Sequence, residues 1–248
     1  MKKIALVTGS SRGIGAATAI LLAEKGFDIC INYKNNSLAA NEILRRTKKF
    51  GIKCIAVKAD VSNETQVINL FETIDQQLGP VTALVNNAGI LLPQSKLVNL
   101  NAKRINTLLT GNVTSYFLCC QQAVKRMSTE FLGVGGAIVN VSSIAARTGS
   151  PGEYIDYAAS KGAVDTLTKG LSVEVASEGI RVNGVRPGFI KTEMHADGGE
   201  PGRIDRIKNN VPMQRGGETF EVASAVAWLL SDAASYVTGT FINVAGGR

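Results

Sequence analysis

Two side chains that can move a proton, Tyr157 and Lys161, lie four residues apart in the run YAASK. On a helix this spacing places both on one face, so that the lysine ammonium can lie under the tyrosine ring. A free phenol has a pKa near ~10, and a neighbouring cation lowers it toward neutral pH. The pair therefore predicts an acid/base device, although the same spacing also fits a polar pair on a surface helix.

A serine lies close enough in the sequence to join this pair. Ser143 comes just after the apolar run 137–141, which has the composition of a buried strand. A hydroxyl at the end of a strand is free to hydrogen-bond a substrate oxygen. Ser143, Tyr157 and Lys161 together could protonate or deprotonate an alcohol oxygen.

The start of the chain has the pattern of a nucleotide-binding turn. An apolar strand is expected at 4–8, and Gly9, Gly13 and Gly15 follow it at the opening of a helix. Glycines at this place let the backbone approach a pyrophosphate, which then lies on the exposed amides of the helix N-terminus. The spacing GxxxGxG lacks the Gly-Lys-Ser/Thr of a nucleoside triphosphatase, which argues against that class of enzyme.

The second strand, expected at 28–33, ends where a dinucleotide fold reads the adenosine ribose. An acidic residue there would favour NAD, but the strand runs into Tyr33 and Lys34 instead. Lys34 and Arg12 suit a 2′-phosphate, which favours NADP(H) while leaving NAD(H) possible. Lys34 also fits a solvated loop lysine. Asp60, after the next strand, could accept from the adenine amino group.

Strands and helices alternate along the rest of the chain, which predicts one α/β domain over 1–248. We expect a Rossmann-type, doubly wound sheet of about seven parallel strands with helices on both faces. Further strands are expected at 53–58, 81–85, 137–141, 180–185 and 240–244, and helices at 37–50, 63–78, 101–133, 156–178 and 219–231. Residues 189–213 are rich in glycine and charge and hold the only histidine, so we expect a lid over the site.

Composition narrows the functional classes. With 248 residues, 45% of them apolar and 19% charged, the chain resembles an ordinary cytosolic globular protein. The net charge of +7 comes from scattered lysines and arginines, so we expect a phosphate-bearing small molecule as partner and no nucleic acid. Neither a run of 18 apolar residues nor a signal-peptide cleavage site is present, so we expect a cytoplasmic protein without membrane association.

The four cysteines, at positions 30, 54, 119 and 120, have no metal-binding spacing. We expect them to be reduced core residues in a reducing compartment, and we expect no metal site.

These motifs, in this order, resemble the short-chain dehydrogenase/reductase family over essentially the whole chain. The resemblance rests on TGSSRGIG, NNAG, Asn112, Ser143, YAASK and RPGFIKT at family spacing. It implies a catalytic set of Asn112, Ser143, Tyr157 and Lys161, with Tyr157 as acid/base. It further implies that Lys161 also binds the nicotinamide ribose and that Asn112 holds a water in a proton relay. A homotetramer, or a homodimer, assembled through the long helices is implied as well.

The motifs and the resemblance together predict a cofactor-contacting set. Its members are Gly9, Ser11, Arg12, Gly13, Ile14, Gly15, Tyr33, Lys34, Asp60, Val61, Asn86, Ala88, Gly89, Tyr157, Lys161, Pro187, Gly188, Ile190 and Thr192.

One departure from the family pattern affects the substrate rather than the chemistry. The segment between Ser143 and Tyr157 is one residue longer than the commonest family spacing, in the loop 149–154. The motifs and the family resemblance together favour an NADP(H)-dependent enzyme that interconverts a carbonyl and a secondary alcohol. This loop and the lid look most similar to those of sugar-dehydrogenase-like, mostly uncharacterised members of the family, a resemblance that implies a sugar, polyol or small ketone as substrate. Two alternatives stay open: a 3-oxoacyl-thioester reductase, and a non-catalytic NADP(H)-binding sensor.

Overall fold

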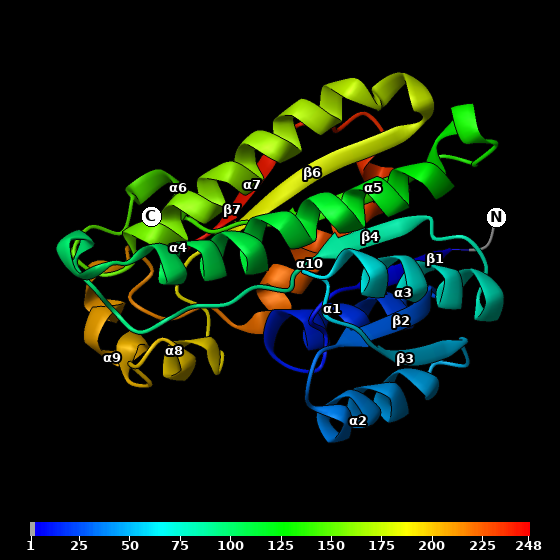
Figure 1. Ribbon diagram of the computed structural model, residues 1–248. Coiled ribbons are helices and arrows are strands. Elements are labelled where there is room, and N and C mark those ends of the chain that lie inside the picture. Colours follow the sequence, from blue (N-terminus) through cyan, green and yellow to red (C-terminus); the bar gives the residue numbers. More distant parts are fainter. Residues whose placement is uncertain (1–2) are drawn as a thin grey trace.

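The computed structural model describes residues 3–248 and contains one seven-stranded parallel sheet (Figure 1). The strands lie in the order β3-β2-β1-β4-β5-β6-β7. Their bounds are Ile4–Val7 (β1), Asp28–Tyr33 (β2), Cys54–Lys58 (β3), Ala83–Asn86 (β4), Gly136–Val141 (β5), Ile180–Pro187 (β6) and Phe241–Val244 (β7). The expected doubly wound α/β fold is confirmed. Because all pairs are parallel, the carboxyl ends of the strands meet at one edge, and the strand order reverses between β1 and β4.

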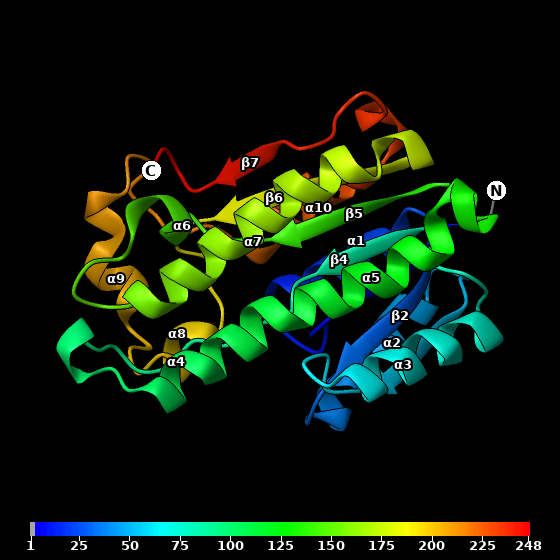
Figure 2. The ribbon, with the colours of Figure 1, turned by 45° about the horizontal axis from the view of Figure 1, so that its top comes forward.

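Helices cover both faces of the sheet (Figures 1 and 2). The long ones are α1 (Gly13–Glu24), α2 (Ser37–Lys48), α3 (Glu64–Gln77), α4 (Ala102–Leu109), α5 (Ser115–Met127), α7 (Ile155–Glu174) and α10 (Thr219–Leu230). One face packs against α1, α2 and α10, and the other against α3, α5 and α7. Each face has its own apolar core, and the side chains of β1 alternate between the two: Ala5 and Val7 belong to one, Ile4 and Leu6 to the other.

Local sequence explains where several helices begin. Asn36, Asn63 and Asn101 each accept a hydrogen bond from a first-turn amide, at the starts of α2, α3 and α4. Such caps satisfy amides that have no partner within the helix. At α10, Glu218 and Glu221 form a reciprocal capping box.

The segment expected as one or two helices over 101–133 is interrupted. A π-helical turn, η2 (Thr110–Thr114), joins α4 to α5, and α5 ends at Met127. A π-turn inserts an extra residue into the helical ladder and is frequent at functional sites. Here it contains Asn112, a residue of the catalytic set that the family resemblance implies.

The segment 189–213 forms short helices at the carboxyl edge of the sheet. These are α8 (Met194–Asp197) and α9 (Arg203–Ile207), which lie at the same end of the molecule as α6 (Ala145–Thr148) and opposite the N-terminus (Figure 1). Although this segment is rich in glycine and charge, Ile190, Arg203, Ile207 and Val211 are all buried. In the described part of the chain, no helix is long and apolar enough to cross a membrane.

Candidate active site

Two adjoining cavities lie at the carboxyl edge of the sheet. The larger, of 920 Å³, is lined by residues that follow β1, β2, β3 and β4. The smaller, of 140 Å³, is lined by Ser143, Tyr157 and Lys161 together with residues of 187–195. Ile14, Asn87, Gly89, Thr192 and Met194 belong to both walls. A molecule in the large cavity can therefore reach Ser143, Tyr157 and Lys161 in the small one.

Most of the predicted cofactor set lines these cavities. The large cavity is lined by Gly9, Ser11, Arg12, Gly13, Ile14, Tyr33, Lys34, Asp60, Val61, Ala88, Gly89 and Thr192. The small cavity adds Tyr157, Lys161, Pro187, Gly188 and Ile190.

Three predicted site residues lie behind these walls instead of lining them: Gly15, Asn86 and Asn112. At Gly15 an added Cβ would lie 2.5 Å from Asn87 Nδ2 and 2.6 Å from the Gly9 carbonyl oxygen, so the glycine permits close packing of the turn. Asn86 is buried and donates to Asn140 Oδ1 at 2.9 Å, inside the core. Gly15 and Asn86 therefore support the cavity walls through packing and hydrogen bonding behind them.

Asn112 hydrogen-bonds the Ile90 backbone and the residue before Lys161. Its Oδ1 accepts from the Ile90 amide at 2.7 Å, and its Nδ2 donates to the Ile90 carbonyl at 3.0 Å and to Ser160 Oγ at 3.1 Å. The side chain is fully buried. It therefore ties the strand-end loop after β4 to α7, one residue before Lys161. The water-holding role implied for it stays a proposal.

Lys161 is buried, with 3% of its surface exposed. Its Nζ donates to the Val141 carbonyl at 2.8 Å and contacts the Tyr116 hydroxyl at 3.2 Å. An ammonium has three donors, so one remains for a ligand in the cavity. Burial lowers the pKa of Lys161 to about 7, and Asp165 opposes this shift. The cost of removing a cation from water outweighs the nearby carboxylate.

The pKa of Tyr157 moves in the opposite direction from the one that its spacing to Lys161 predicts. Burial raises the pKa of the Tyr157 phenol to about 12, although a hydrogen bond with the Ser143 side chain lowers it. Lys161 Nζ lies 5.8 Å from the centre of the Tyr157 ring. Desolvation of the phenolate therefore dominates, and Tyr157 is protonated throughout the neutral range.

Tyr116 is a site residue that the sequence did not single out. It is fully buried, its hydroxyl donates to the Val141 carbonyl at 2.9 Å, and Lys161 Nζ lies 5.0 Å from its ring centre. The signal was present, since Tyr116 comes four residues after Asn112 and shares its helix face. Tyr116 therefore helps to fix the position of the Lys161 ammonium.

The loop that is one residue longer than usual is connected to the short helices α8 and α9. Tyr154 Oη donates to the Gly198 carbonyl at 3.1 Å, and Glu153 forms ion pairs with Arg203 and Arg206. No pattern in the sequence shows that the loop 149–154 and the segment 189–213 meet. Together they form the outer wall of the small cavity.

The large cavity fits a nicotinamide dinucleotide. Gly9 and Gly13 have positive φ values of 60° and 57°, and an added Cβ at Gly9 would lie 2.9 Å from Ala88 Cα. The glycine turn therefore brings the backbone close to the cavity at the start of α1, where helix amides favour a phosphate. The volume is in the range of sites for large ligands, roughly 300–1,000 Å³.

The two cations expected to bind a 2′-phosphate both have carboxylate partners. Lys34 Nζ lies 2.6 Å from Asp60 Oδ2, and Arg12 pairs with Asp197 of α8. The pKa of the Asp60 carboxyl is lowered: burial would raise it, but the hydrogen bonds from Lys34 and Ser62 outweigh burial. Both cations line the cavity and are largely exposed.

Known proteins resemble this chain in sequence and fold over nearly its full length. A family model described as enoyl-(acyl carrier protein) reductase matches residues 9–248. A short-chain dehydrogenase of Burkholderia cenocepacia, solved in complex with NADP, matches with a TM-score of 0.90 at 32% identity, covering 99% of this chain and 97% of its own. This chain belongs to the short-chain dehydrogenase/reductase family. It is an NAD(P)-dependent oxidoreductase.

Within this family, relatives with different names match this chain over nearly its whole length. An uncharacterised oxidoreductase of Escherichia coli (strain K12), YgfF, is 63% identical over 245 residues, covering 99% of each chain. A 3-oxoacyl-[acyl-carrier-protein] reductase of Staphylococcus epidermidis is 36% identical, covering 100% of this chain and 99% of the relative. The acetoin dehydrogenase YohF of Salmonella typhimurium has a TM-score of 0.87 at 37% identity, covering 100% and 97%.

Proposed function

We propose that this protein interconverts a small carbonyl compound and the corresponding secondary alcohol, with Tyr157 as acid/base. The observation that carries the proposal is the convergence of Tyr157, Ser143 and Lys161 in a small cavity that opens into a dinucleotide-sized one. When bound, NADP(H) supplies or accepts the hydride. The chain itself has to hold the substrate oxygen and handle the proton.

Each catalytic side chain has a distinct task in this proposal. In carbonyl reduction Tyr157 Oη donates its proton to the substrate oxygen, and Ser143 Oγ donates a hydrogen bond to the same oxygen. The raised pKa of Tyr157, about 12, keeps the phenol in the form that can donate. The free donor of Lys161 is available to the nicotinamide ribose, while Tyr116 and the Val141 carbonyl fix its position. Asn112 keeps this lysine and the Ile90 backbone in place.

We also propose that NADP(H) is preferred, with NAD(H) possible. Arg12 and Lys34 border the large cavity, and β2 ends in Tyr33 without an acidic residue. A carboxylate at that position would repel a 2′-phosphate. The NADP complex of the Burkholderia relative supports the same preference.

The size of the small cavity favours a small substrate. At 140 Å³ it is below the roughly 300–1,000 Å³ of sites for drug-sized ligands. A small ketone, sugar or polyol fits this volume, and the likeness to an acetoin dehydrogenase agrees with it. A 3-oxoacyl thioester is the second candidate, because several relatives that are about 36% identical carry that name. A non-catalytic sensor is disfavoured, since it has no need of the convergent proton-handling side chains.

The remaining proposals concern the lid, the assembly and the compartment. Residues 189–213 are proposed to close over the substrate, since six of them line the small cavity: Phe189, Ile190, Thr192, Met194, His195 and Arg203. A homotetramer is proposed because apolar side chains of α4, α5 and α7 are exposed. A cytoplasmic location is proposed on the four free cysteines, three of which are buried.

A single substitution tests the proposed chemistry. Tyr157→Phe removes only the hydroxyl, so we expect turnover of any reducible carbonyl to fall by at least about a hundredfold, while the dissociation constant for NADPH changes less than about twofold. Single-turnover oxidation of NADPH, followed by absorbance on a panel of small ketones, sugars and acyl thioesters, measures the first quantity. Fluorescence titration measures the second. Unchanged single-turnover rates in this variant would remove Tyr157 from the chemistry.

A further inference from the structure

The small cavity has cationic walls. Its charged lining residues are Lys161, Arg203 and Arg248, and among the described residues no carboxylate lines it. His195, which also lines it, is neutral: burial lowers its pKa, and its Nε2 lies 2.9 Å from the Ile190 carbonyl oxygen. A carbonyl oxygen only accepts, so Nε2 carries the proton. The positive charge of the walls therefore comes from two arginines and, below its pKa of about 7, from Lys161.

We propose that the substrate carries an anionic group, a carboxylate or a phosphate, which Arg203 and Arg248 bind while Tyr157 and Ser143 hold its carbonyl oxygen. The inference rests on the proposed function and names the substrate class for the same site. The substrate is then a small keto acid or keto phosphate, or the matching hydroxy compound. The four side chains all line one cavity of 140 Å³, so one small molecule can touch both ends.

Arg203 is a buried cation in the wall of the small cavity. Only 6% of its surface is exposed, and its guanidinium lies 4.6 Å from the Tyr154 ring centre and 5.4 Å from that of Phe189. Its Nη2 pairs with Glu153, whereas Nη1 is buried without a hydrogen-bond partner, 3.5 Å from Glu200 Oε2. Glu153 and Glu200 thus hold the guanidinium in the cavity wall, against the rings of Tyr154 and Phe189.

Arg248 provides a cation that pairs with no side-chain carboxylate among the described residues. Its guanidinium lies 5.1 Å from the centre of the Phe189 ring, so that this ring contacts both arginines. It is exposed, in contrast to Arg203, and lines the same cavity. The guanidinium fork is suited to two parallel hydrogen bonds with a carboxylate or phosphate. The aromatic contact holds it at the cavity mouth, which leaves those donors free.

The test compares substrates that differ only in the anion. The probes are acetoacetate against methyl acetoacetate, 2-oxobutanoate against its methyl ester, and dihydroxyacetone phosphate against dihydroxyacetone, each with NADPH. We expect kcat/KM to be at least about tenfold higher for the anionic member of one or more pairs. A preference confined to the first two pairs identifies a carboxylate substrate, and one confined to the third identifies a phosphate.

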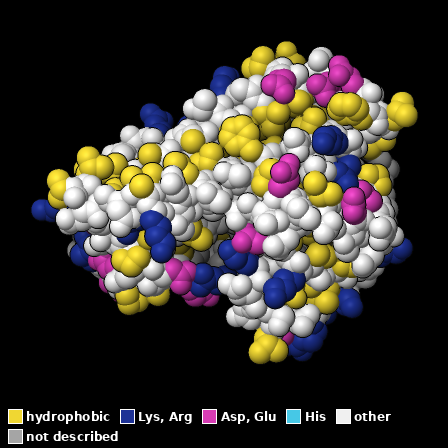
Figure 3. Space-filling model, viewed as in Figure 1, with side chains coloured by type: hydrophobic (Ala, Val, Ile, Leu, Met, Phe, Trp, Pro, Cys, Tyr) yellow, Lys and Arg dark blue, Asp and Glu magenta, His cyan; other side chains and the backbone are white. Residues whose placement is uncertain are grey.

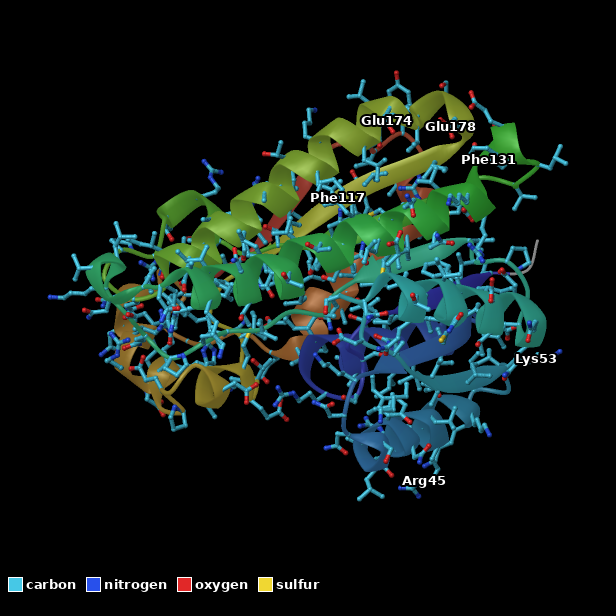
Figure 4. The ribbon with its side chains drawn as sticks, viewed as in Figure 1. Arg45, Lys53, Phe117, Phe131, Glu174 and Glu178 are labelled. Atoms are coloured by element: carbon cyan, nitrogen blue, oxygen red, sulfur yellow. The ribbon has the colours of Figure 1, made fainter. Side chains whose placement is uncertain are left out.

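Substitution of the exposed arginine makes the assignment specific to this site. Arg248→Gln should lower the anion-to-neutral ratio of kcat/KM by about tenfold or more. Arg248→Lys should retain only part of it, because the charge remains while the two parallel hydrogen bonds of the guanidinium are lost. Arg45→Gln is the matched control, since Arg45 lies on the exposed side of α2, far from α8 and α9 (Figure 4). It should leave the ratio at the unmodified value.

Binding of an unreactive anion provides a second readout that does not depend on turnover. With NADPH present, calorimetry should detect butanoate but not butanamide, and Arg248→Gln should weaken butanoate binding. Equal kcat/KM values within every pair, or a ratio that Arg248→Gln leaves unchanged, would overturn the anion site while the reductase function stands. A protein that binds NADPH yet reduces neither member of any pair, nor any panel ketone, would instead overturn the proposed function and this inference with it.

Discussion

At the scale of single residues, burial and nearby charge have opposite effects on the pKa values of Tyr157 and Lys161. The spacing of Tyr157 and Lys161 predicts that the cation lowers the tyrosine pKa, yet burial raises it to about 12. The same burial lowers the pKa of Lys161 to about 7, which weakens the cation itself near neutral pH. The lysine is therefore held by Val141 and Tyr116 as much as by charge. Its protonation can be tested through stability.

The free energy of unfolding should depend on pH through Lys161. Its pKa is near ~10.4 in an unfolded chain and about 7 in the folded protein. Between these values the unfolded chain binds a proton that the folded chain does not, so stability rises with pH, by at most about 1.4 kcal/mol per unit. Below pH 7 or so both states are protonated, and the contribution is flat. Urea denaturation of the unmodified protein and of Lys161→Met, between pH 6 and 10, measures the difference.

A lysine far from the site serves as control for this measurement. Lys53 is exposed beside β3 (Figure 4), and Lys53→Met should leave the pH profile of the unfolding free energy unchanged. The unfolding free energy of the unmodified protein minus that of Lys161→Met should become more positive as the pH rises. A difference that is constant from pH 6 to 10 would contradict the lowered lysine pKa.

The sequence predicts the residues that carry short motifs and misses those that the fold brings together. Tyr157, Lys161 and Ser143 line the small cavity because helix and strand geometry relates them locally. Arg203 and Arg248 reach the same cavity from distant segments, where ring contacts with Phe189 and Tyr154 place them. No local pattern marks such contacts, because they depend on how the segment 189–213 and the chain end pack.

At the scale of elements, periodicity locates the helices and strands well but not the irregular turns. The strand expected at 4–8 is found as Ile4–Val7, and the helix expected at 219–231 as Thr219–Leu230. The segment 101–133 has apolar residues at helical spacing, which conceals the π-turn at Thr110–Thr114. Within that turn Asn112 is buried and makes three hydrogen bonds to distant parts of the chain, contacts that helix propensity does not contain.

The short helix α8 also has an electrostatic contact with the cofactor cavity. Asp197 pairs with Arg12, the cation that is proposed to meet a 2′-phosphate. Both side chains are about half exposed, so the pair is a weak one by itself. Because a phosphate and Asp197 compete for one guanidinium, binding of NADP(H) and the position of α8 should be linked.

Asp197→Asn tests this link and the cofactor preference together. In the unmodified protein NADPH should bind more tightly than NADH, and the substitution should tighten NADPH binding by about two- to fivefold, since it removes the competing charge. The dissociation constant for NADH should not change. Asp205→Asn, which alters an exposed pair with Lys208, is the control. Titrations that give equal constants for NADPH and NADH in the unmodified protein would refute the preference, and equal tightening of both would refute the competition.

At the scale of the whole molecule, one face has apolar side chains that the chain itself does not cover. Figure 3 shows hydrophobic side chains over α4, α5 and α7, and Figure 4 places Phe117 between α5 and α7. Leu109 is 38% exposed, Phe117 52% and Val173 71%. Helices of a single chain rarely present so many apolar side chains on one side unless a partner covers them. A second copy of this chain is the occupant that we propose, through the same helices on both subunits.

The assembly follows from covering this face. Two such faces buried against each other remove apolar surface from water and make a dimer, so light scattering at micromolar concentration should give a mass of at least twice the 26.2 kDa of one chain; the proposed homotetramer gives four times that mass. Phe117→Glu places a charge in the centre of the contact and should reduce the mass to that of a smaller species. Phe50→Glu changes an aromatic residue of similar exposure, 43%, that follows α2 on the other side of the molecule, and should leave the mass unchanged. A mass near 26.2 kDa for the unmodified protein would mean that the exposed face has no partner among copies of this chain.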